Sequence, residues 1–218
     1  MAIEEIIERL EQAYGPRRWQ PDRDPIDVLI RTILSQNTSD TNSGRAFATL
    51  KDSFASWEAV ASAPAEHIAR VIKSGGLSQI KAVRIKQVLE QIEKEQGRIR
   101  LDFLKSKPMA ETEDYLMRLP GVGHKTARCV LLFALGKPSL PVDTHIFRVA
   151  KRLGLIDSRV SIEKAHSLLQ EQIPPSKVYQ FHIHMIEHGR RICHARQPRC
   201  NRCILRGVCP SSLRFHRS

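Results

Sequence analysis

Residues 119–127 read Leu-Pro-Gly-Val-Gly-His-Lys-Thr-Ala and place two glycines two positions apart between two helical segments. Gly121 and Gly123 have no side chain, so backbone can approach backbone closely at this turn. The first amide groups of the following helix have no partner within that helix and point outward as an anion site that fits a phosphate. Such a contact reads no base and supplies salt-sensitive, sequence-independent affinity for a nucleic acid. Taken alone, the two glycines favour an ordinary tight turn between packed helices.

Helical periodicity extends from this turn in both directions. After the turn, apolar residues recur with the spacing of one helix face at Ala127, Val130, Leu131, Ala134 and Leu135. The same spacing predicts helices around residues 3–10, 26–34, 47–54, 85–92 and 146–153. No segment alternates between apolar and polar residues as a half-buried strand does. The sequence therefore predicts an all-α protein, with a main bundle that ends near residue 137.

The charge balance favours a polyanionic partner. The 218 residues include 35 Lys and Arg against 23 Asp and Glu, which gives a formal net charge of +12. Nucleic acid is the partner that this balance favours, although ribosomal, membrane-surface and ordinary basic proteins share it. The first residues do not form a signal peptide, and no apolar stretch reaches the roughly 20 residues that span a bilayer. We therefore expect an intracellular protein without a membrane partner.

Four of the five cysteines lie close together near the carboxyl end. Cys193, Cys200, Cys203 and Cys209 have the spacing C-x6-C-x2-C-x5-C. In a reducing compartment such a cluster indicates metal ligands rather than disulfides. Four thiolates hold either tetrahedral zinc or an iron-sulfur cluster, and coordination chemistry alone leaves both open. Cys129 lies outside this pattern, and we expect it to be a small buried side chain.

The hairpin and a second motif together resemble a known family. Residues 119–127, followed by a Gly/Pro-rich loop and by Val-Asp-Thr-His at 142–145, resemble the endonuclease III family of the helix-hairpin-helix (HhH-GPD) DNA glycosylase superfamily. The resemblance extends from about residue 26 to residue 210. It implies two helical lobes with a DNA-binding cleft between them.

The resemblance also implies where the two domains begin and end. A six-helix bundle domain over residues 19–137 carries the helix-hairpin-helix at about 113–135. Residues 1–18 plus 138–218 form the second helical domain, which ends in a [4Fe-4S] cluster loop at 193–209. The family thus favours iron-sulfur over zinc, with Cys193, Cys200, Cys203 and Cys209 as the ligands.

Lys125 lies in the first turn of the helix after the hairpin. An attacking lysine must be a neutral amine, and the positive end of a helix dipole together with flanking bulk disfavours the ammonium form. Without the motif, a solvated surface lysine would be the default interpretation. The resemblance implies that Lys125 attacks C1′ of a flipped-out nucleoside, forms a Schiff base and cuts the strand by β-elimination.

Asp143 precedes a predicted helix, where an aspartate commonly caps the first turn. The resemblance implies a second role, in which its carboxylate stabilises positive charge on the sugar and assists deprotonation of Lys125. His145 matches the same motif and either packs near the site or contacts a phosphate.

Other residues are expected to contact the duplex. The resemblance assigns the filling of the gap left by the flipped base to Asn37, with Gln36 beside it, and to a leucine wedge at Leu77. Endonuclease III has glutamine where this chain has Asn37, and the stretch at 35–40 looks like the plant 5-methylcytosine glycosylases of the superfamily. The hairpin residues Gly121, Val122 and Gly123 are expected to hold the backbone. Residues 189–218 contain eight arginines and no acid, and Arg196 and Arg199 lie inside the cysteine loop, where we expect DNA contacts.

The leading hypothesis is a monomeric base-excision glycosylase and abasic-site lyase that acts through Lys125 on oxidised pyrimidines in duplex DNA. A second keeps the chemistry but changes the base to a mismatched uracil or thymine or to a 5-methylated pyrimidine. A third is a DNA-binding module without catalysis, which leaves the co-occurrence of Lys125 and Asp143 unexplained. We expect the protein in the cytoplasm or nucleoid of a prokaryote.

Overall fold

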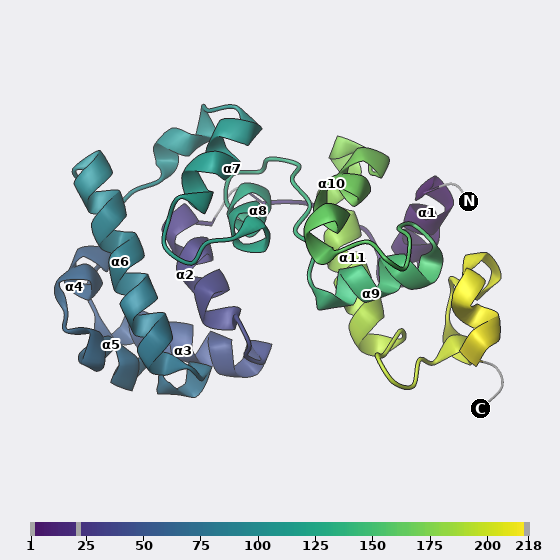
Figure 1. The fold of residues 1–218 in the computed structure, drawn as a ribbon, viewed down its shortest axis with the longest axis horizontal. Coiled ribbons are helices and arrows are strands. Elements are labelled where there is room, and N and C mark those ends of the chain that lie inside the picture. The colour runs from purple at the N-terminus through teal and green to yellow at the C-terminus, as the bar shows by residue number, and fades with distance from the viewer. Residues whose placement is uncertain (1–2, 21–22, 216–218) are drawn as a thin grey trace. The chain divides into compact units, whose positions relative to one another are not determined.

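The computed structural model describes residues 3–20 and 23–215, and every regular element in these ranges is an α-helix or a 3-10 helix (Figure 1). The predicted all-α class is confirmed. No helix in the described ranges combines the length and the hydropathy needed to cross a membrane.

Two compact units divide the chain. Unit 1 comprises Met1–Gln20 and Gly136–Ser218, and unit 2 comprises Pro21–Leu135. Unit 1 therefore joins the two ends of the sequence, whereas unit 2 is continuous.

Unit 2 contains the longest helix and the hairpin. Its elements are α2 (Pro25–Ser35), α3 (Asp40–Ser53), α4 (Trp57–Ser62), α5 (Ala65–Val71), η1 (Lys73–Gly75), α6 (Ser78–Gln96), η2 (Asp102–Lys105), α7 (Met109–Met117) and α8 (His124–Phe133).

Helix α2 is the centre of this unit. Asp24 caps its start, since Oδ1 accepts hydrogen bonds from the amides of Ile26 (2.8 Å) and Asp27 (3.1 Å), and Pro25 occupies the first turn. Leu29, Ile30, Ile33 and Leu34 are fully buried. Both α3 and α8 pack against α2, so its apolar surface organises the core on which the hairpin is mounted.

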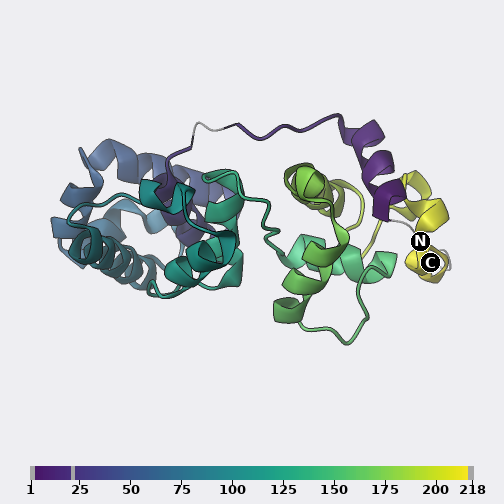
Figure 2. The same ribbon diagram turned by 90° about the horizontal axis from the view of Figure 1, so that it is seen from above.

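Unit 1 combines the first helix with the carboxy-terminal elements. These are α1 (Ile3–Tyr14), α9 (Thr144–Leu153), α10 (Ile162–Gln172), η3 (Pro175–Lys177), α11 (Val178–Arg191), η4 (Cys200–Arg202), η5 (Arg206–Val208) and η6 (Pro210–Phe215). Helix α11 packs against both α9 and α1. Helix α1 lies beside the cysteine-bearing segment (Figure 2), and Arg9 Nη1 donates to the Ile204 carbonyl at 3.3 Å.

Buried histidines shape the core of unit 1. His182 donates from Nδ1 to the Pro141 carbonyl at 3.0 Å, and His184 donates from Nε2 to the Gly15 carbonyl at 2.8 Å. Burial lowers the pKa of His184 below its ordinary value, because a charged imidazolium would lose its hydration. These side chains supply donors to carbonyls of the connecting loops, which water does not reach once they are buried.

The helices expected from periodicity around residues 3–10, 26–34, 47–54, 85–92, 127–135 and 146–153 are confirmed as α1, α2, α3, α6, α8 and α9. The periodicity did not identify five others, of which α7 was expected only as the helix that ends at the hairpin. Helices α4 and α5 contain only 6 and 7 residues, too few to show a repeat. In α10 and α11 buried histidines replace apolar residues on the inner face, so a hydrophobicity pattern underestimates that face.

Gly136 offers a test of packing within unit 1. It has φ +64°, and a Cβ placed on it would lie 2.8 Å from Cη2 of Trp19. Gly97 has φ +69° with nothing within 4 Å of such a Cβ. Gly97→Ala is expected to lower the free energy of unfolding by about 1–2 kcal/mol, which is the left-handed strain alone. Gly136→Ala is expected to cost about 1–3 kcal/mol more, because Trp19 must also move.

Urea unfolding followed by circular dichroism measures the difference, and Trp19 fluorescence reports the local displacement. Equal losses for the two variants would contradict the close packing of Trp19 on Gly136.

Candidate nucleic-acid interface and active site

The hairpin between α7 and α8 has the geometry expected of a phosphate-binding turn. Gly121 has φ +69°, in the left-handed region that favours glycine. The Val122 amide donates to the Leu119 carbonyl at 3.1 Å. Gly123 is the N-cap of α8 and contributes no side-chain acceptor, so the first amides of α8 lack a capping side chain. Val122 is 5% exposed and belongs to the core; any contact it makes with DNA must therefore come from its backbone.

Arg84 of α6 lies directly over the hairpin. A Cβ on Gly121 would lie 2.0 Å from Arg84 Nε, so only glycine fits beneath this side chain. Arg84 Nη1 donates to Gln36 Oε1 at 2.6 Å, and Gln36 Nε2 donates to Thr126 Oγ1 at 3.4 Å. Gln36, predicted as a DNA contact, thus connects the loop after α2 to α6 and α8. Nothing in the sequence pattern distinguished Arg84 from the other basic residues.

Lys125 is the second residue of α8 and is half-buried. The basic residues around it are engaged by Glu113 of α7, whose carboxylate accepts from His124 Nδ1 (3.0 Å) and Arg128 Nε (2.8 Å). Burial raises the pKa of Glu113, but the hydrogen bonds from Arg128 and His124 outweigh burial and bring the pKa below its ordinary value. Glu113 therefore stays ionised and joins the two helices of the hairpin beside Lys125.

Asp143 is the N-cap of α9. Its Oδ1 accepts from the Ile146 amide at 2.8 Å, with an extended backbone at φ −97° and ψ −178°. The capping role expected of this position is confirmed. The cap uses one of the two carboxylate oxygens, and a second role for Asp143 stays a prediction.

His145 is half-buried and faces α11. Its Nδ1 lies 3.1 Å from Arg148 Nη2, and a Cβ on Gly189 would lie 2.9 Å from His145 Cβ. Burial lowers the pKa of His145 below its ordinary value. These contacts fit the packing interpretation of His145, and a phosphate contact stays a prediction.

Lys125 belongs to unit 2 and Asp143 to unit 1. Their joint action, and the cleft expected between the lobes, stay predictions. What unit 2 brings together by itself is the hairpin, Lys125 and the two loops expected to enter the duplex.

Those two loops carry Asn37 and Leu77. Asn37 has φ 52° and Leu77 has φ 47°, and no other non-glycine residue in 3–20 and 23–215 has positive φ. Both side chains are exposed, Leu77 to 53%. Left-handed backbone is costly outside glycine and persists only where neighbouring contacts enforce it. The two predicted gap-filling residues thus share an uncommon, strained backbone conformation and an exposed side chain.

The four clustered cysteines line a single cavity of unit 1. Its volume is about 400 Å³ with the solvent at its mouth included, and Cys193, Cys200, Cys203 and Cys209 all contribute to the wall. The Arg199 amide donates to the Ile192 carbonyl at 2.9 Å and closes the loop between the first two cysteines. Cys129 is buried in α8, in the other unit, as predicted.

Two arginines of α9 hold the start of this loop. Arg152 donates to Cys193 Sγ (3.2 Å), to the His194 carbonyl (2.7 Å) and to the Ala195 carbonyl (2.7 Å). Arg148 Nε donates to the Cys193 carbonyl at 3.0 Å. In the sequence, only their spacing of four residues on a basic helix sets these two arginines apart.

The thiols influence one another's ionisation. Burial, together with the nearby thiols of Cys193, Cys209 and Cys200, raises the pKa of the Cys203 thiol to about 11. Burial also raises the pKa of Cys209. Thiols this close resist ionising together unless positive charge enters the cavity, which a coordinated metal supplies. Within the described ranges no three Cys, His, Asp or Glu side chains are grouped so as to hold one metal ion.

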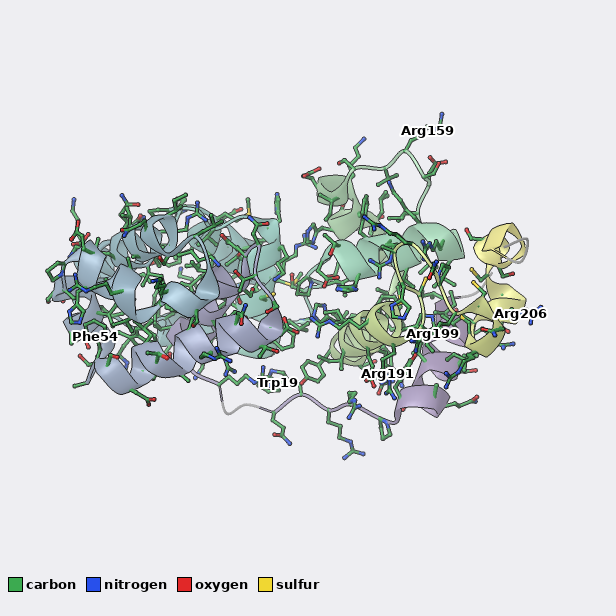
Figure 3. All side chains as sticks on the ribbon, turned by 90° about the horizontal axis from the view of Figure 1, so that it is seen from below. Trp19, Phe54, Arg159, Arg191, Arg199 and Arg206 are labelled. Carbon is green, nitrogen blue, oxygen red and sulfur yellow. The ribbon has the colours of Figure 1, made fainter. Side chains whose placement is uncertain are left out.

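Basic side chains follow the same carboxy-terminal segment. Arg196 and Arg199 are both exposed, and Arg191, Arg199 and Arg206 lie on this part of unit 1 (Figure 3). The positions suit phosphate contacts, which remain predicted for Arg196 and Arg199.

An all-helical fold with this hairpin, a first-turn lysine and a capping aspartate defines a class of DNA repair protein. Residues 30–175 match the HhH-GPD superfamily of base excision DNA repair proteins, and the chain belongs to this family. The resemblance to endonuclease III is confirmed by the relatives. The chain is 34% identical over 208 residues to endonuclease III of Thermotoga maritima, which covers 95% of this chain and 92% of that protein.

A plant relative and a solved structure extend the comparison. The chain is 39% identical over 168 residues to a protein of Arabidopsis thaliana named as a DNA glycosylase, covering 77% of this chain and 57% of that protein. It therefore spans little more than half the length of this relative. A trapped covalent intermediate of endonuclease III with DNA has the same fold, with a TM-score of 0.84, 29% identity and coverage of 97% of this chain and 96% of that chain.

Proposed function

We propose that this protein is a base-excision DNA glycosylase with associated abasic-site lyase activity, and that it removes oxidised pyrimidines from duplex DNA through a Schiff base on Lys125. The observation that carries the proposal is the position of Lys125 in the first turn of α8, directly after the Gly121–Gly123 hairpin. A primary amine mounted on a phosphate-binding turn lies where an extruded sugar can reach it. The protein acts as a monomer in the compartment that holds the DNA, the cytoplasm or nucleoid of a prokaryote.

The reaction divides between the two units. The hairpin holds a phosphate while the damaged nucleotide leaves the stack, and Asn37 and Leu77 fill the gap. The ionised carboxylate of Asp143 assists loss of a proton from the Lys125 ammonium to solvent, and it opposes the positive charge that develops on the sugar. The Lys125 amine bonds to C1′ as the glycosidic bond breaks and the base departs with the bonding electron pair.

Ring opening of the sugar then gives the Schiff base between Lys125 and C1′. Loss of a proton from C2′ expels the 3′ phosphate by β-elimination and cuts the strand. Hydrolysis of the imine releases Lys125, so the enzyme returns to its starting state.

We propose that Cys193, Cys200, Cys203 and Cys209 hold a [4Fe-4S] cluster. The four thiols surround a cavity rather than a point, which suits a multi-atom cluster better than one zinc ion with Zn–S bonds of about 2.3 Å. Arg152, 3.2 Å from Cys193 Sγ, is placed to stabilise a thiolate. When bound, the cluster supplies a rigid crosslink and no acid–base chemistry. The loop that it fixes presents Arg196 and Arg199 to DNA phosphates.

The lyase proposal predicts a covalent adduct. Incubation with abasic-site duplex DNA and borohydride is expected to trap the wild-type protein, because borohydride reduces the imine to a stable secondary amine. Lys125→Ala is expected to give no adduct. Lys105→Ala, which removes the same charge from an exposed lysine of unit 2, should retain trapping. A wild-type protein that binds this DNA without trapping would instead be the non-catalytic DNA-binding module.

The choice of base is tested with a panel of duplexes carrying thymine glycol, uracil, T·G mismatches or 5-methylcytosine. Single-turnover excision is expected to be fastest on thymine glycol. The Gln36-Asn37 stretch resembles the plant 5-methylcytosine glycosylases. The excision rate on thymine glycol is therefore compared with the rates on the other three substrates. Faster excision of any of them would overturn the assignment to oxidised pyrimidines while leaving the lyase chemistry intact.

Asp143 allows its cap and its charge to be separated. Asn caps a helix about as well as Asp, so Asp143→Asn is expected to change the free energy of unfolding by less than about 0.5 kcal/mol. The excision rate should nevertheless fall by about 10²–10⁴-fold, the range for loss of a general acid–base group. Asp143→Ala should lose activity and also about 0.5–2 kcal/mol of stability. If Asp143→Asn excised the base at the wild-type rate, Asp143 would have only its structural role as a helix cap.

The cluster predicts a brown protein with absorption near 400 nm, about four irons per chain and acid-labile sulfide. Cys203→Ala is expected to lose this absorption and to unfold more easily, since one ligand is gone. Cys129→Ser, in the other unit, should keep both properties and serves as the matched control. A colourless wild-type protein that contains zinc would contradict the iron assignment.

A further inference from the structure

Lys81 of α6 is buried although it is a lysine. It is 2% exposed, and its ammonium donates to the Leu34 carbonyl at 2.7 Å, to Thr38 Oγ1 at 2.9 Å and to the Gly75 carbonyl at 2.8 Å. A lysine ammonium has three protons to donate, and each finds an acceptor here. Lysines are almost never fully buried without such partners.

The three acceptors come from two loops that are distant in sequence. Leu34 and Thr38 belong to the end of α2 and the loop that follows it, and Gly75 belongs to η1, before α6. Thr38 Oγ1 also donates to the Gly75 carbonyl, which joins the two loops directly. The Lys81 ammonium and the Thr38 hydroxyl thus form one closed hydrogen-bond network between them.

These are the loops that carry the two left-handed non-glycine residues. Asn37 lies one residue before Thr38, and Leu77 lies two residues after Gly75. Both side chains are exposed, while Lys81, at the centre of the network, is buried and Thr38 is half-buried. Strained backbone of this kind costs on the order of 1–3 kcal/mol per residue and needs surrounding contacts to maintain it. The Lys81 network provides those contacts on the inner side of both loops.

We infer that Lys81 is a positioning residue that fixes the Asn37 and Leu77 loops to each other, so that both side chains enter the gap left by a flipped base as one preorganised unit. The inference rests on the proposed function for its substrate. Fixing two insertion residues in advance removes the conformational entropy that would otherwise oppose insertion. An apolar residue of the same length would remove the Lys81 donor from the Leu34 carbonyl and from Thr38 Oγ1, and the Gly75 carbonyl would keep only the Thr38 hydroxyl.

Lys86, five residues further along α6, provides a matched control. Its ammonium also donates to a backbone carbonyl, that of Ala61 at the end of α4, and pairs with Glu90 at 3.1 Å. It therefore connects α6 to another helix of the same unit without touching either loop. Lys86→Met removes the same charge and a comparable hydrogen bond, whereas Lys81→Met also removes the connection between the loops.

The test compares binding to two duplexes of one sequence, one undamaged and one with a tetrahydrofuran abasic analogue opposite 2-aminopurine. Wild type is expected to prefer the abasic duplex and to change the 2-aminopurine fluorescence as side chains enter the gap. Lys81→Met should reduce that preference at least tenfold and weaken the fluorescence change. Affinity for undamaged duplex should stay within twofold, because it depends on phosphate contacts. Lys86→Met should behave as wild type.

A merely structural role predicts a different pattern. Loss of folded protein would reduce both affinities in proportion and leave their ratio unchanged. The inference would be overturned if Lys81→Met kept both the wild-type ratio of affinities for the two duplexes and the wild-type fluorescence change. If Lys81→Met does not fold, Thr38→Val removes the hydroxyl that joins the loops with little change of shape, and a smaller loss in the same ratio is expected; an unchanged ratio would again overturn it.

The two proposals can fail separately. Combining Leu77→Ala with Lys81→Met should reduce the preference for the abasic duplex by less than the two single losses together, because Lys81 acts through Leu77. Fully additive losses would count against the inference. Binding ratios need no chemistry, so they test Lys81 even if no adduct is trapped on abasic DNA. Absence of trapping would overturn the lyase proposal alone.

Discussion

A carbonyl oxygen that loses water on folding must find a donor, and this constraint organises both units. The helices satisfy their own backbones, but the loops between them do not. Lys81 donates hydrogen bonds to carbonyls at the end of α2 and in η1, and Arg152 donates to a carbonyl at the start of the cysteine loop. His182 and His184 serve the connections at Pro141 and Gly15. Most of these donors are cationic or titratable, so the basic composition contributes to the interior as well as to the surface.

Contacts between side chains also hold the elements of the candidate site within unit 2 together. Arg84 covers Gly121 and binds Gln36, which ties the hairpin to the loop that carries Asn37. Glu113 engages the basic residues that flank Lys125. The hairpin, the loop that carries Asn37 and the residues that flank Lys125 are therefore held by neighbours that the proposed reaction does not use. Preorganisation of this kind is where much of the catalytic advantage of an enzyme arises.

Evolutionary kinship and local geometry support different parts of the interpretation. Membership of the HhH-GPD superfamily follows from the match over residues 30–175 and is independent of any side-chain contact. The capping of α9 by Asp143 and the shared cavity of the four cysteines follow from the structure. The base that is excised stays a proposal, and Asn37, where this chain departs from endonuclease III, lies in the loop that we expect to inspect the duplex. Fold and chemistry are thus better determined than specificity.

The sequence by itself determined the helical class, six of the helices, the hairpin and the candidate roles of Lys125, Asp143 and the cysteines. These features are local, since periodicity, caps and motif spacing involve residues close together in the chain. Only the tertiary structure showed which groups accept hydrogen bonds from Lys81, Arg84 and Arg152, because these partners lie 6 to 48 residues away. A basic side chain in the sequence gives no sign of whether it will meet water, a phosphate or a buried carbonyl. The packing of the helices determines which loop carbonyls lose their water, and therefore which basic side chains are needed as donors inside the protein.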